Sequence, residues 1–184
     1  MVRIYGNRRL KTLAGPQTRP TTARVREMVF HRWRDRISDC RWLDLCAGCG
    51  SMGAEALCRG AALVYGIEQA RAACRVTRLN WQQVASPEQI FRLWQGEVTR
   101  ILPQLQGEVF DLIYFDPPYD SDLYGPVLQA IADHQLLKPT GELAVEHRPR
   151  QGPTPSANFQ VSHTRAYGNT ALTLLRIAPD HQVT

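Results

Sequence analysis

Short apolar runs alternate with amphipathic segments through the middle of the chain. Runs rich in aliphatic and aromatic residues predict strands, and apolar residues at helical spacing predict helices. Strands and helices that alternate in this way form a parallel sheet with helices on both faces, which places the chain in the α/β class. The predicted strands are Arg41–Leu45, Ala62–Glu68, Ile90–Gln95, Asp111–Phe115 and Gly141–His147, and the predicted helices are Ser51–Arg59, Ala70–Gln83, Val98–Leu105 and Leu123–Asp133.

The C-terminal part of the chain has a different pattern. Three prolines predict a loop over residues 148–158. Two β-like runs follow, Phe159–Ala166 and Thr170–Ile177, and the three residues between them predict a closing antiparallel hairpin. A mostly parallel sheet of seven strands that ends in such a hairpin is typical of the Rossmann-like class I methyltransferase fold. This is an analogy of fold, and fold alone does not establish function.

The N-terminal part of the chain is strongly basic. Residues 1–36 contain ten Lys or Arg and two acidic residues, whereas the whole chain of 184 residues has a formal net charge of +5. Glycine and prolines predict that residues 1–20 are extended or looped, and residues 21–36 have the spacing of a helix capped by Thr21 or Thr22. A basic arm on a nearly neutral body indicates a polyanionic partner. The alternative is a solvated basic face without a partner.

Composition excludes several classes of protein. No apolar run approaches the roughly 18–20 residues of a membrane span, and the N-terminus lacks a signal-like apolar region, so we expect a cytoplasmic monomer without membrane association. Five cysteines make an odd number and predict reduced thiols. Cys46 and Cys49 form a C-x-x-C, but no second pair follows, so we expect no metal site. A redox pair would compete with a ligand in the same loop.

A glycine-rich turn follows the first strand of the predicted sheet. Gly48, Gly50 and Gly53 form a G-x-G-x-x-G pattern, which lets the backbone approach a ligand at the carboxyl edge of the sheet. The pattern is compatible with a dinucleotide, whose pyrophosphate would sit at the helix N-terminus. Asp44 lies four residues before Gly48 and would repel phosphate there, whereas it would attract the cationic end of S-adenosylmethionine. The turn therefore matches S-adenosylmethionine better than NAD.

Two further acidic residues follow the next two strands. Glu68 lies about 20 residues beyond the glycines, where a carboxylate accepts both ribose hydroxyls of either cofactor. Glu97 follows the third strand and would bind the adenine amino group, although a plain helix N-terminal acid is the simpler interpretation of Glu97 alone.

The most specific motif is Asp116-Pro117-Pro118-Tyr119, which follows the fourth strand of the predicted sheet. The two prolines fix the backbone and remove two N–H donors, so carbonyl oxygens and a carboxylate face the site. Asp116 and the carbonyl of Pro117 would accept both N–H groups of an exocyclic base amine, and Asp116 would take its proton after attack. Tyr119 would stack on an extruded base. The alternative, a rigid turn without a ligand, loses weight because this strand shares an edge with the glycine turn.

These residues resemble the RsmD-type methyltransferases, which methylate the N2 amine of a guanine in bacterial 16S ribosomal RNA. The resemblance rests on Arg19-Pro20-Thr21-Thr22-Ala23-Arg24-Val25-Arg26-Glu27, on the block from Asp44 to Ala61, on Asp116–Tyr119 and on Arg165-Ala166-Tyr167-Gly168. The first of these stretches distinguishes the family from DNA adenine and protein glutamine methyltransferases with the same catalytic motif.

The resemblance implies an activity and a set of site residues. It implies that the protein methylates guanine N2 with S-adenosylmethionine, within the small ribosomal subunit, and that residues 37–184 form the methyltransferase domain. Residues 1–36 would then contact RNA. The implied cofactor-binding residues are Asp44, Ala47, Gly48, Gly50, Glu68 and Glu97, the catalytic residues are Asp116, Pro117, Pro118 and Tyr119, and the RNA-binding residues are Arg8, Arg9, Lys11, Arg19 and Arg24.

Three alternatives remain open at this stage. An N6-adenine methyltransferase acting on DNA or RNA would use the same catalytic turn. An NAD-dependent oxidoreductase would use the glycine turn and leave Asp116–Tyr119 without a role. A non-enzymatic RNA-binding protein with a vestigial cofactor pocket would bind RNA without methyl transfer.

Overall fold

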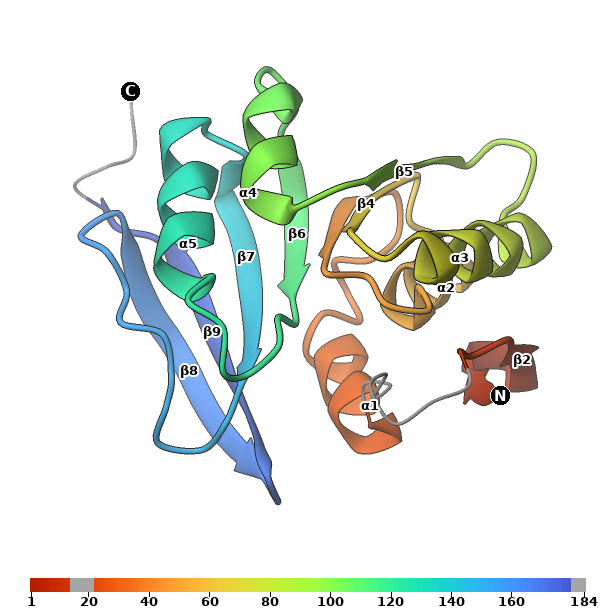
Figure 1. The fold of residues 1–184 in the computed structure, drawn as a ribbon, viewed down its shortest axis with the longest axis horizontal. Helices are drawn as coiled ribbons and strands as arrows, with labels where there is room; N and C mark the ends of the chain where they lie inside the picture. Colours follow the sequence, from red (N-terminus) through yellow and green to blue (C-terminus); the bar gives the residue numbers. More distant parts are fainter. Residues whose placement is uncertain (14–21, 180–184) are drawn as a thin grey trace.

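The computed structural model describes residues 1–13 and 22–179. Within these residues, a central sheet of seven strands has the order β5-β4-β3-β6-β7-β9-β8, and β1 (Val2–Ile4) and β2 (Arg8–Leu10) form a small separate hairpin around the 3₁₀ turn η1 (Tyr5–Asn7). Figure 1 shows the central sheet with β8 and β9 at one end and β5 at the other. The strands of this sheet are β3 (Arg41–Leu45), β4 (Leu63–Glu68), β5 (Ile90–Gln95), β6 (Phe110–Phe115), β7 (Leu137–His147), β8 (Phe159–Tyr167) and β9 (Thr170–Ile177).

The direction of the strands confirms the predicted fold class. The strands from β3 to β7 run parallel to their neighbours, β9 is antiparallel to β7, and β8 is antiparallel to β9. The strand order reverses between β3 and β6, and ligands of open α/β sheets bind at such a switch point, beyond the carboxyl ends of the strands. The topology therefore places the end of β3 beside the end of β6.

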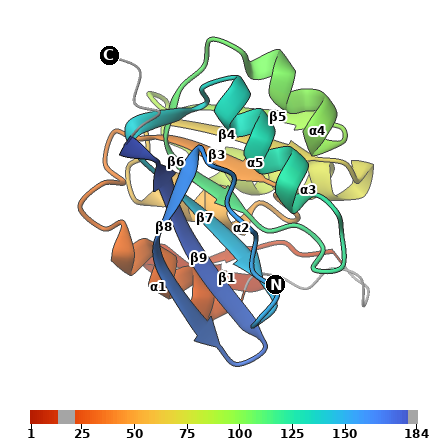
Figure 2. The ribbon, with the colours of Figure 1, turned by 90° about the vertical axis from the view of Figure 1, so that its left-hand side faces the viewer.

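Helices cover both faces of the sheet (Figure 2). Alternate residues of each strand point to opposite faces, so Trp42 joins the core on one face and Leu43 the core on the other. The first core includes buried residues of α1, α2 and α3, and the second includes those of α4, η2 and α5. Their bounds are α1 (Ala23–Arg32), α2 (Ser51–Cys58), α3 (Arg71–Val84), α4 (Val98–Ile101), η2 (Leu102–Leu105) and α5 (Tyr124–Asp133).

The N-terminal helix belongs to this core. Val25, Val29, Phe30 and Trp33 are fully buried, and the ring of Phe30 stacks on Trp42 at a centroid distance of 5.4 Å. Thr22 is the N-cap, because its side chain accepts a hydrogen bond from the backbone N–H of Val25. The helix ends at Arg32, four residues before the predicted end.

Residues 1–13, the described part of the segment expected to be extended or looped, form two short extended strands joined by a turn, and they pack against the rest of the protein. The β1–β2 hairpin buries Ile4 and Leu10, although most of its other residues are exposed. Side chains from elsewhere in the chain bind its backbone and that of the next residue: Arg26 donates to the carbonyl of Arg3, Gln83 donates to the carbonyl of Arg9, and Asn80 exchanges two hydrogen bonds with the backbone of Lys11. These contacts are between distant parts of the chain, so the local sequence does not indicate them.

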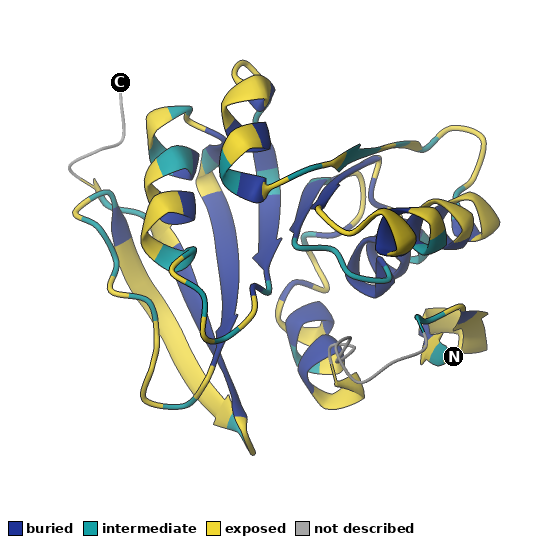
Figure 3. Ribbon diagram, in the orientation of Figure 1, coloured by how far each residue is buried: buried dark blue, intermediate teal, exposed yellow. Residues whose placement is uncertain are grey.

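The other predicted boundaries lie within a few residues of those in the structure. The clearest difference is β7, which begins at Leu137 and not at Gly141, with a shift of register opposite Phe110 and Leu112. Pro139 lacks a backbone N–H, which explains why this segment did not have the pattern of a strand. Burial is highest in the middle strands of the sheet, whereas β8 is an exposed edge strand (Figure 3). In the part of the chain that the structure describes, we find no helix that is both long and apolar enough to cross a membrane.

Candidate active site

The glycine turn and the Asp116–Tyr119 turn line the same pocket, which has a volume of about 780 Å³. This volume is ordinary for a small-molecule site. The pocket opens at the carboxyl edge of the sheet, where the ends of β3 and β6 lie beside each other. Of the predicted catalytic and cofactor-binding residues, those lining it are Asp44, Ala47, Gly48, Glu68, Glu97, Asp116, Pro117, Pro118 and Tyr119.

Gly50 is the predicted cofactor residue that is not among the residues lining the pocket. A Cβ atom at Gly50 would lie 2.5 Å from Cγ2 of Thr77 and 2.7 Å from Nε1 of Trp81. A Cβ atom at Gly53 would likewise lie 2.5 Å from Trp81. These two glycines therefore leave room for a buried tryptophan of α3. Gly48 has a φ of +58° and no atom within 4 Å of its Cβ position, so its backbone faces open space.

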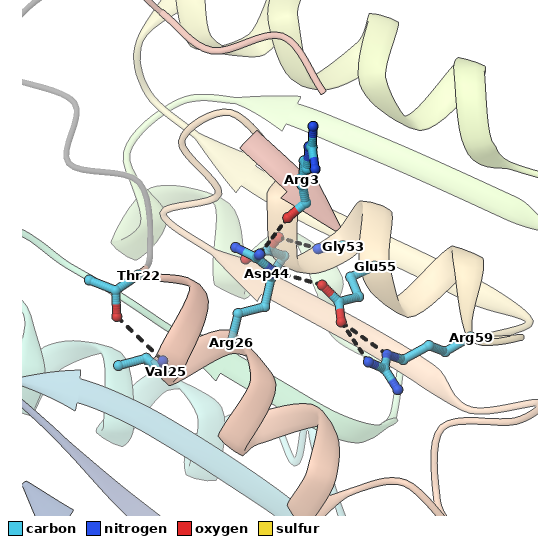
Figure 4. A network of polar contacts seen from close by, with 8 residues as sticks. All are labelled: Arg3, Thr22, Val25, Arg26, Asp44, Gly53, Glu55 and Arg59. Carbon is cyan, nitrogen blue, oxygen red and sulfur yellow. Dashed lines mark hydrogen bonds and ion pairs between the residues drawn. The ribbon is translucent and has the colours of Figure 1, made fainter. Parts of the chain in front are cut away.

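Two carboxylates hold the glycine turn by its backbone. Glu68 accepts hydrogen bonds from the N–H of Gly48 at 2.8 Å and of Ala70 at 2.7 Å. Asp44 accepts from the N–H of Gly53 at 2.9 Å, a contact drawn in Figure 4. The N–H groups around the start of α2, which would bind a pyrophosphate in a dinucleotide site, thus already have a carboxyl group as partner. This arrangement disfavours NAD.

The environment of Asp44 changes its acidity. The side chain is 2% exposed, and its burial raises the pKa of this carboxyl to about 8, with a smaller contribution from the charge of Glu68. A cationic ligand would favour the ionised form. The donor set therefore fits a ligand with an ammonium group and a sulfonium.

The thiols of Cys46 and Cys49 also line the pocket. Burial is the main cause that raises the pKa of both thiols, which disfavours the reactive thiolate form. Among the described residues, no group of three or more His, Cys, Asp or Glu side chains is arranged to hold a metal ion.

The Asp116–Tyr119 turn is anchored at both ends. The N–H of Asp116 donates to the carbonyl of Leu45, which joins the ends of β6 and β3. The hydroxyl of Tyr119 donates to Oε1 of Glu146 at 2.9 Å and lies 2.8 Å from Oγ1 of Thr170. Burial raises the pKa of Tyr119, and so do the charges of Glu146 and Asp116, so the phenol keeps its proton.

The lining residues that were not predicted from the sequence include Thr12, Leu13, Thr22 and Glu146. Glu146 lies near the end of a predicted strand, so the edge argument used for Asp44 and Asp116 would also have identified it. Thr12 and Leu13 have no local signal. They reach the pocket because Asn80 binds the backbone of Lys11 and also donates to the carbonyl of Cys49 in the glycine turn.

The predicted RNA-binding residues occupy different environments. Arg8 donates to the carbonyl of Val84, the last residue of α3, and to the sulfur of Cys58, the last residue of α2. Because the opposite ends of these helices face the pocket, Arg8 lies away from it. The side chains of Arg9 and Lys11 are exposed, and Arg19 lies outside the described residues.

Arg24 is near the pocket. Its guanidinium lies 5.9 Å from the ring centroid of Tyr167, which pairs with Thr170 across the β8–β9 hairpin. Arg165 lies 5.5 Å from the same ring, and Arg148 lies 5.9 Å from the ring of Tyr119. We call these three arginines the basic rim: Arg148 contacts the Asp116–Tyr119 turn directly, and Arg24 and Arg165 are connected to it through Tyr167 and its pairing partner Thr170.

Arg26 contributes to the basic charge of the N-terminal segment but is not available to a partner. It is 4% exposed, and it forms a buried ion pair with Glu55 at 2.7 Å and a hydrogen bond to the carbonyl of Arg3. Figure 4 shows that this side chain links α1 to α2, where Glu55 also binds Arg59. Arg26 is therefore part of the structural core, and the net charge of the segment overstates its basic surface.

Comparison with known proteins identifies the family. Residues 2–176 match the family model described as Conserved hypothetical protein 95. The chain is 30% identical to the ribosomal RNA small subunit methyltransferase D of Escherichia coli K12, over 94% of this chain and 88% of that protein. It is 29% identical to the protein of the same name from Haemophilus influenzae, over 78% of this chain and 75% of that protein.

A solved structure has the same fold. It is that of the Escherichia coli protein yhhF, which is named as a methyltransferase; the TM-score is 0.83, the identity is 29%, and the match covers 96% of this chain and 97% of that chain. The chain thus belongs to the Conserved hypothetical protein 95 family, the family of the RsmD-type methyltransferases.

Proposed function

We propose that the protein transfers a methyl group from S-adenosylmethionine to the exocyclic N2 amine of a guanine in small-subunit ribosomal RNA. One observation carries the proposal: a single pocket contains both the glycine turn, which is held by two carboxyl groups, and the Asp116–Tyr119 turn. The names of the relatives support ribosomal RNA of the small subunit as the substrate.

The cofactor end of the pocket is the glycine turn. Asp44 and Glu68 would bind the amino-acid and ribose parts of S-adenosylmethionine, Gly48 would lie against it, and Glu97 would bind its adenine. When bound, this group supplies an electrophilic methyl on a cationic sulfur. The negative charge of Asp44 and Glu68 would stabilise that cation.

The base end of the pocket is the Asp116–Tyr119 turn. A base amine is a weak nucleophile because its lone pair is delocalised into the ring. Asp116 and the Pro117 carbonyl would accept its two N–H groups, favour a pyramidal nitrogen and direct its lone pair towards the cofactor end. Asp116 would then take the surplus proton. Most of the rate enhancement would come from the positioning of the two substrates.

The basic rim supports a nucleic-acid substrate. Arg148 lies over the ring of Tyr119, and Arg24 and Arg165 lie over that of Tyr167. These arginines would contact phosphates of the RNA, and the two rings would be available for stacking. In this proposal residues 37–184 carry the chemistry, and residues 1–36 add RNA contacts through Arg24 and the exposed Arg9 and Lys11.

The direct test is transfer of labelled methyl from S-adenosylmethionine to small ribosomal subunits that lack base methylation, followed by nucleoside analysis. We expect label in N2-methylguanosine and none with Asp116→Ala. Label in N6-methyladenosine would replace the proposed base with adenine. Absence of transfer to any RNA, with no binding of S-adenosylmethionine, would refute the proposed activity.

A further inference from the structure

A second carboxylate lies beside Asp116 at the base end of the pocket. Phe115 of β6 pairs with Val145 of β7 in parallel register, so the next residues, Asp116 and Glu146, follow side by side at the edge of the sheet. Both line the pocket, although Glu146 is only 3% exposed. The role proposed above for Asp116 and Pro117 does not use this second carboxylate.

Tyrosine hydroxyls hold Glu146 in place. Tyr119 donates to Oε1 at 2.9 Å, and Tyr114, which is itself buried, donates to Oε2. Because the Tyr119 hydroxyl has one proton, its contact with Oγ1 of Thr170 is one in which Thr170 donates. Each carboxylate oxygen has a second lone pair, so Glu146 retains the capacity to accept hydrogen bonds from a ligand.

The bases differ in what they present to two adjacent carboxylates. The Watson–Crick edge of guanine has the N1–H donor directly beside the N2 amine. In adenine the atom beside the exocyclic amine is N1, which is an acceptor. A carboxylate next to the one that binds the amine therefore complements guanine and repels adenine, since two acceptors would face each other without a proton.

We propose that Glu146 is a specificity-determining residue that accepts a hydrogen bond from N1–H of the target guanine while Asp116 and Pro117 hold the N2 amine. This inference rests on the proposed function, and it adds the group that selects guanine over adenine. Tyr114 and Tyr119 fix the carboxylate in the orientation that the contact requires.

The test uses 2-aminopurine, which keeps the N2 amine but has an acceptor at N1. The substrates are two small-subunit RNAs that differ only at the target position, where one has guanine and the other has 2-aminopurine. The target base is introduced by ligation, and the RNA is assembled with subunit proteins. We expect the wild-type protein to prefer guanine by at least about 10²-fold in kcat/KM, because a site built for a donor rejects the analogue that lacks it. In Glu146→Gln, whose amide can donate to N1, the preference should fall to within about tenfold.

Two variants separate recognition from support of the structure. Glu142→Gln changes another buried carboxylate of β7, which binds Trp33 and Arg176 outside the pocket, and it should leave the preference unchanged. Tyr119→Phe removes one hydroxyl that holds Glu146 and keeps the ring. We expect it to lower turnover on both substrates and to retain most of the preference for guanine.

Each outcome has a separate meaning. Equal use of guanine and 2-aminopurine by the wild-type protein would overturn the role of Glu146 and leave the methyltransferase activity intact. So would a Glu146→Gln variant that loses both activities in equal proportion, because that is the effect of a residue that only positions Tyr119. Failure of the wild-type protein to methylate the guanine RNA would instead overturn the proposed function.

Discussion

The two ends of the pocket are built with the same side chain, a buried carboxylate, used in different ways. At the cofactor end, Asp44 and Glu68 accept hydrogen bonds from backbone N–H groups of the glycine turn. At the base end, Glu146 accepts from the hydroxyls of Tyr114 and Tyr119. The direction of a backbone N–H is fixed by the fold, whereas the hydrogen of a tyrosine hydroxyl can rotate about the C–O bond. Substitutions at the cofactor end should therefore reduce the stability of the fold and the affinity for the cofactor. Substitutions at the base end should reduce turnover and selectivity for the base.

The largest expected effect lies at the base end. Asp116→Ala should lower kcat by about 10²–10⁴-fold, the usual range for the loss of a positioned acid or base. The dissociation constant for S-adenosylmethionine, measured by calorimetry, should change by less than about threefold. Asp120→Ala is the matched control, since Asp120 is exposed and pairs with Arg148. A comparable loss of kcat in the control would mean that the turn as a whole, and not the carboxylate, matters.

Substitution of two glycines of the same turn should have different costs in stability. Gly50→Ala places a methyl group against Thr77 and Trp81 at a φ of +72°, and we expect it to lower the free energy of unfolding by about 3 kcal/mol. Gly48→Ala meets no neighbour and should cost about 1 kcal/mol for its positive φ. Urea denaturation measures both. Equal losses would contradict the packing role of Gly50.

The substitution Glu68→Gln should weaken binding of S-adenosylmethionine by about 10–100-fold, since hydrogen bonds to a charged group contribute about 1.5–3 kcal/mol. The loss includes the contact of Glu68 with the N–H of Gly48, because a glutamine offers only one acceptor oxygen in place of two. Equilibrium dialysis measures the affinity, with the exposed Glu88→Gln as the control. An unchanged dissociation constant would remove Glu68 from the cofactor site.

A distinctive pH dependence should also mark the cofactor end. The pKa of Asp44 is raised from an ordinary value of 3.8 to about 8 by burial, so between these values the unfolded chain is ionised here while the folded protein keeps the proton. Stability should fall as pH rises through this window, by at most about 1.4 kcal/mol per pH unit. Asp44→Asn should remove this contribution from the pH profile of the urea midpoint. An identical profile in the variant would contradict the raised pKa.

The smallest effects concern the rim. Arg24→Gln should reduce the slope of log K against log salt for RNA binding by about 0.7–0.9, the contribution of one phosphate contact. Arg8→Gln should leave that slope unchanged and lower stability slightly, because Arg8 binds the C-terminal ends of α2 and α3. Filter binding over a range of salt concentrations distinguishes the two. A larger change of slope in Arg8→Gln than in Arg24→Gln would indicate that the N-terminal hairpin is the main electrostatic contact with RNA.

The sequence was a good guide to the ends of parallel strands and a poor guide to contacts between distant segments. The apolar pattern located β3 and β6, and strand direction then brought Asp44 and Asp116 to one edge. The pattern could not distinguish Gly48, which faces the pocket, from Gly50, which makes room for Trp81, because that depends on packing by α3. It also could not distinguish the buried Arg26 from the exposed Arg24, two residues earlier on the same helix.

The bridge made by Asn80 has a consequence for the order in which the protein is completed. Its side chain joins Lys11 to the carbonyl of Cys49, so one wall of the pocket, with Thr12 and Leu13, is held by a residue about 70 positions later in the chain. During synthesis the segment that follows β2 therefore cannot reach its final position until α3 has been made. A shortened chain that lacks residues 1–13 should accordingly lose affinity for a small ligand, even though these residues were first singled out by their charge.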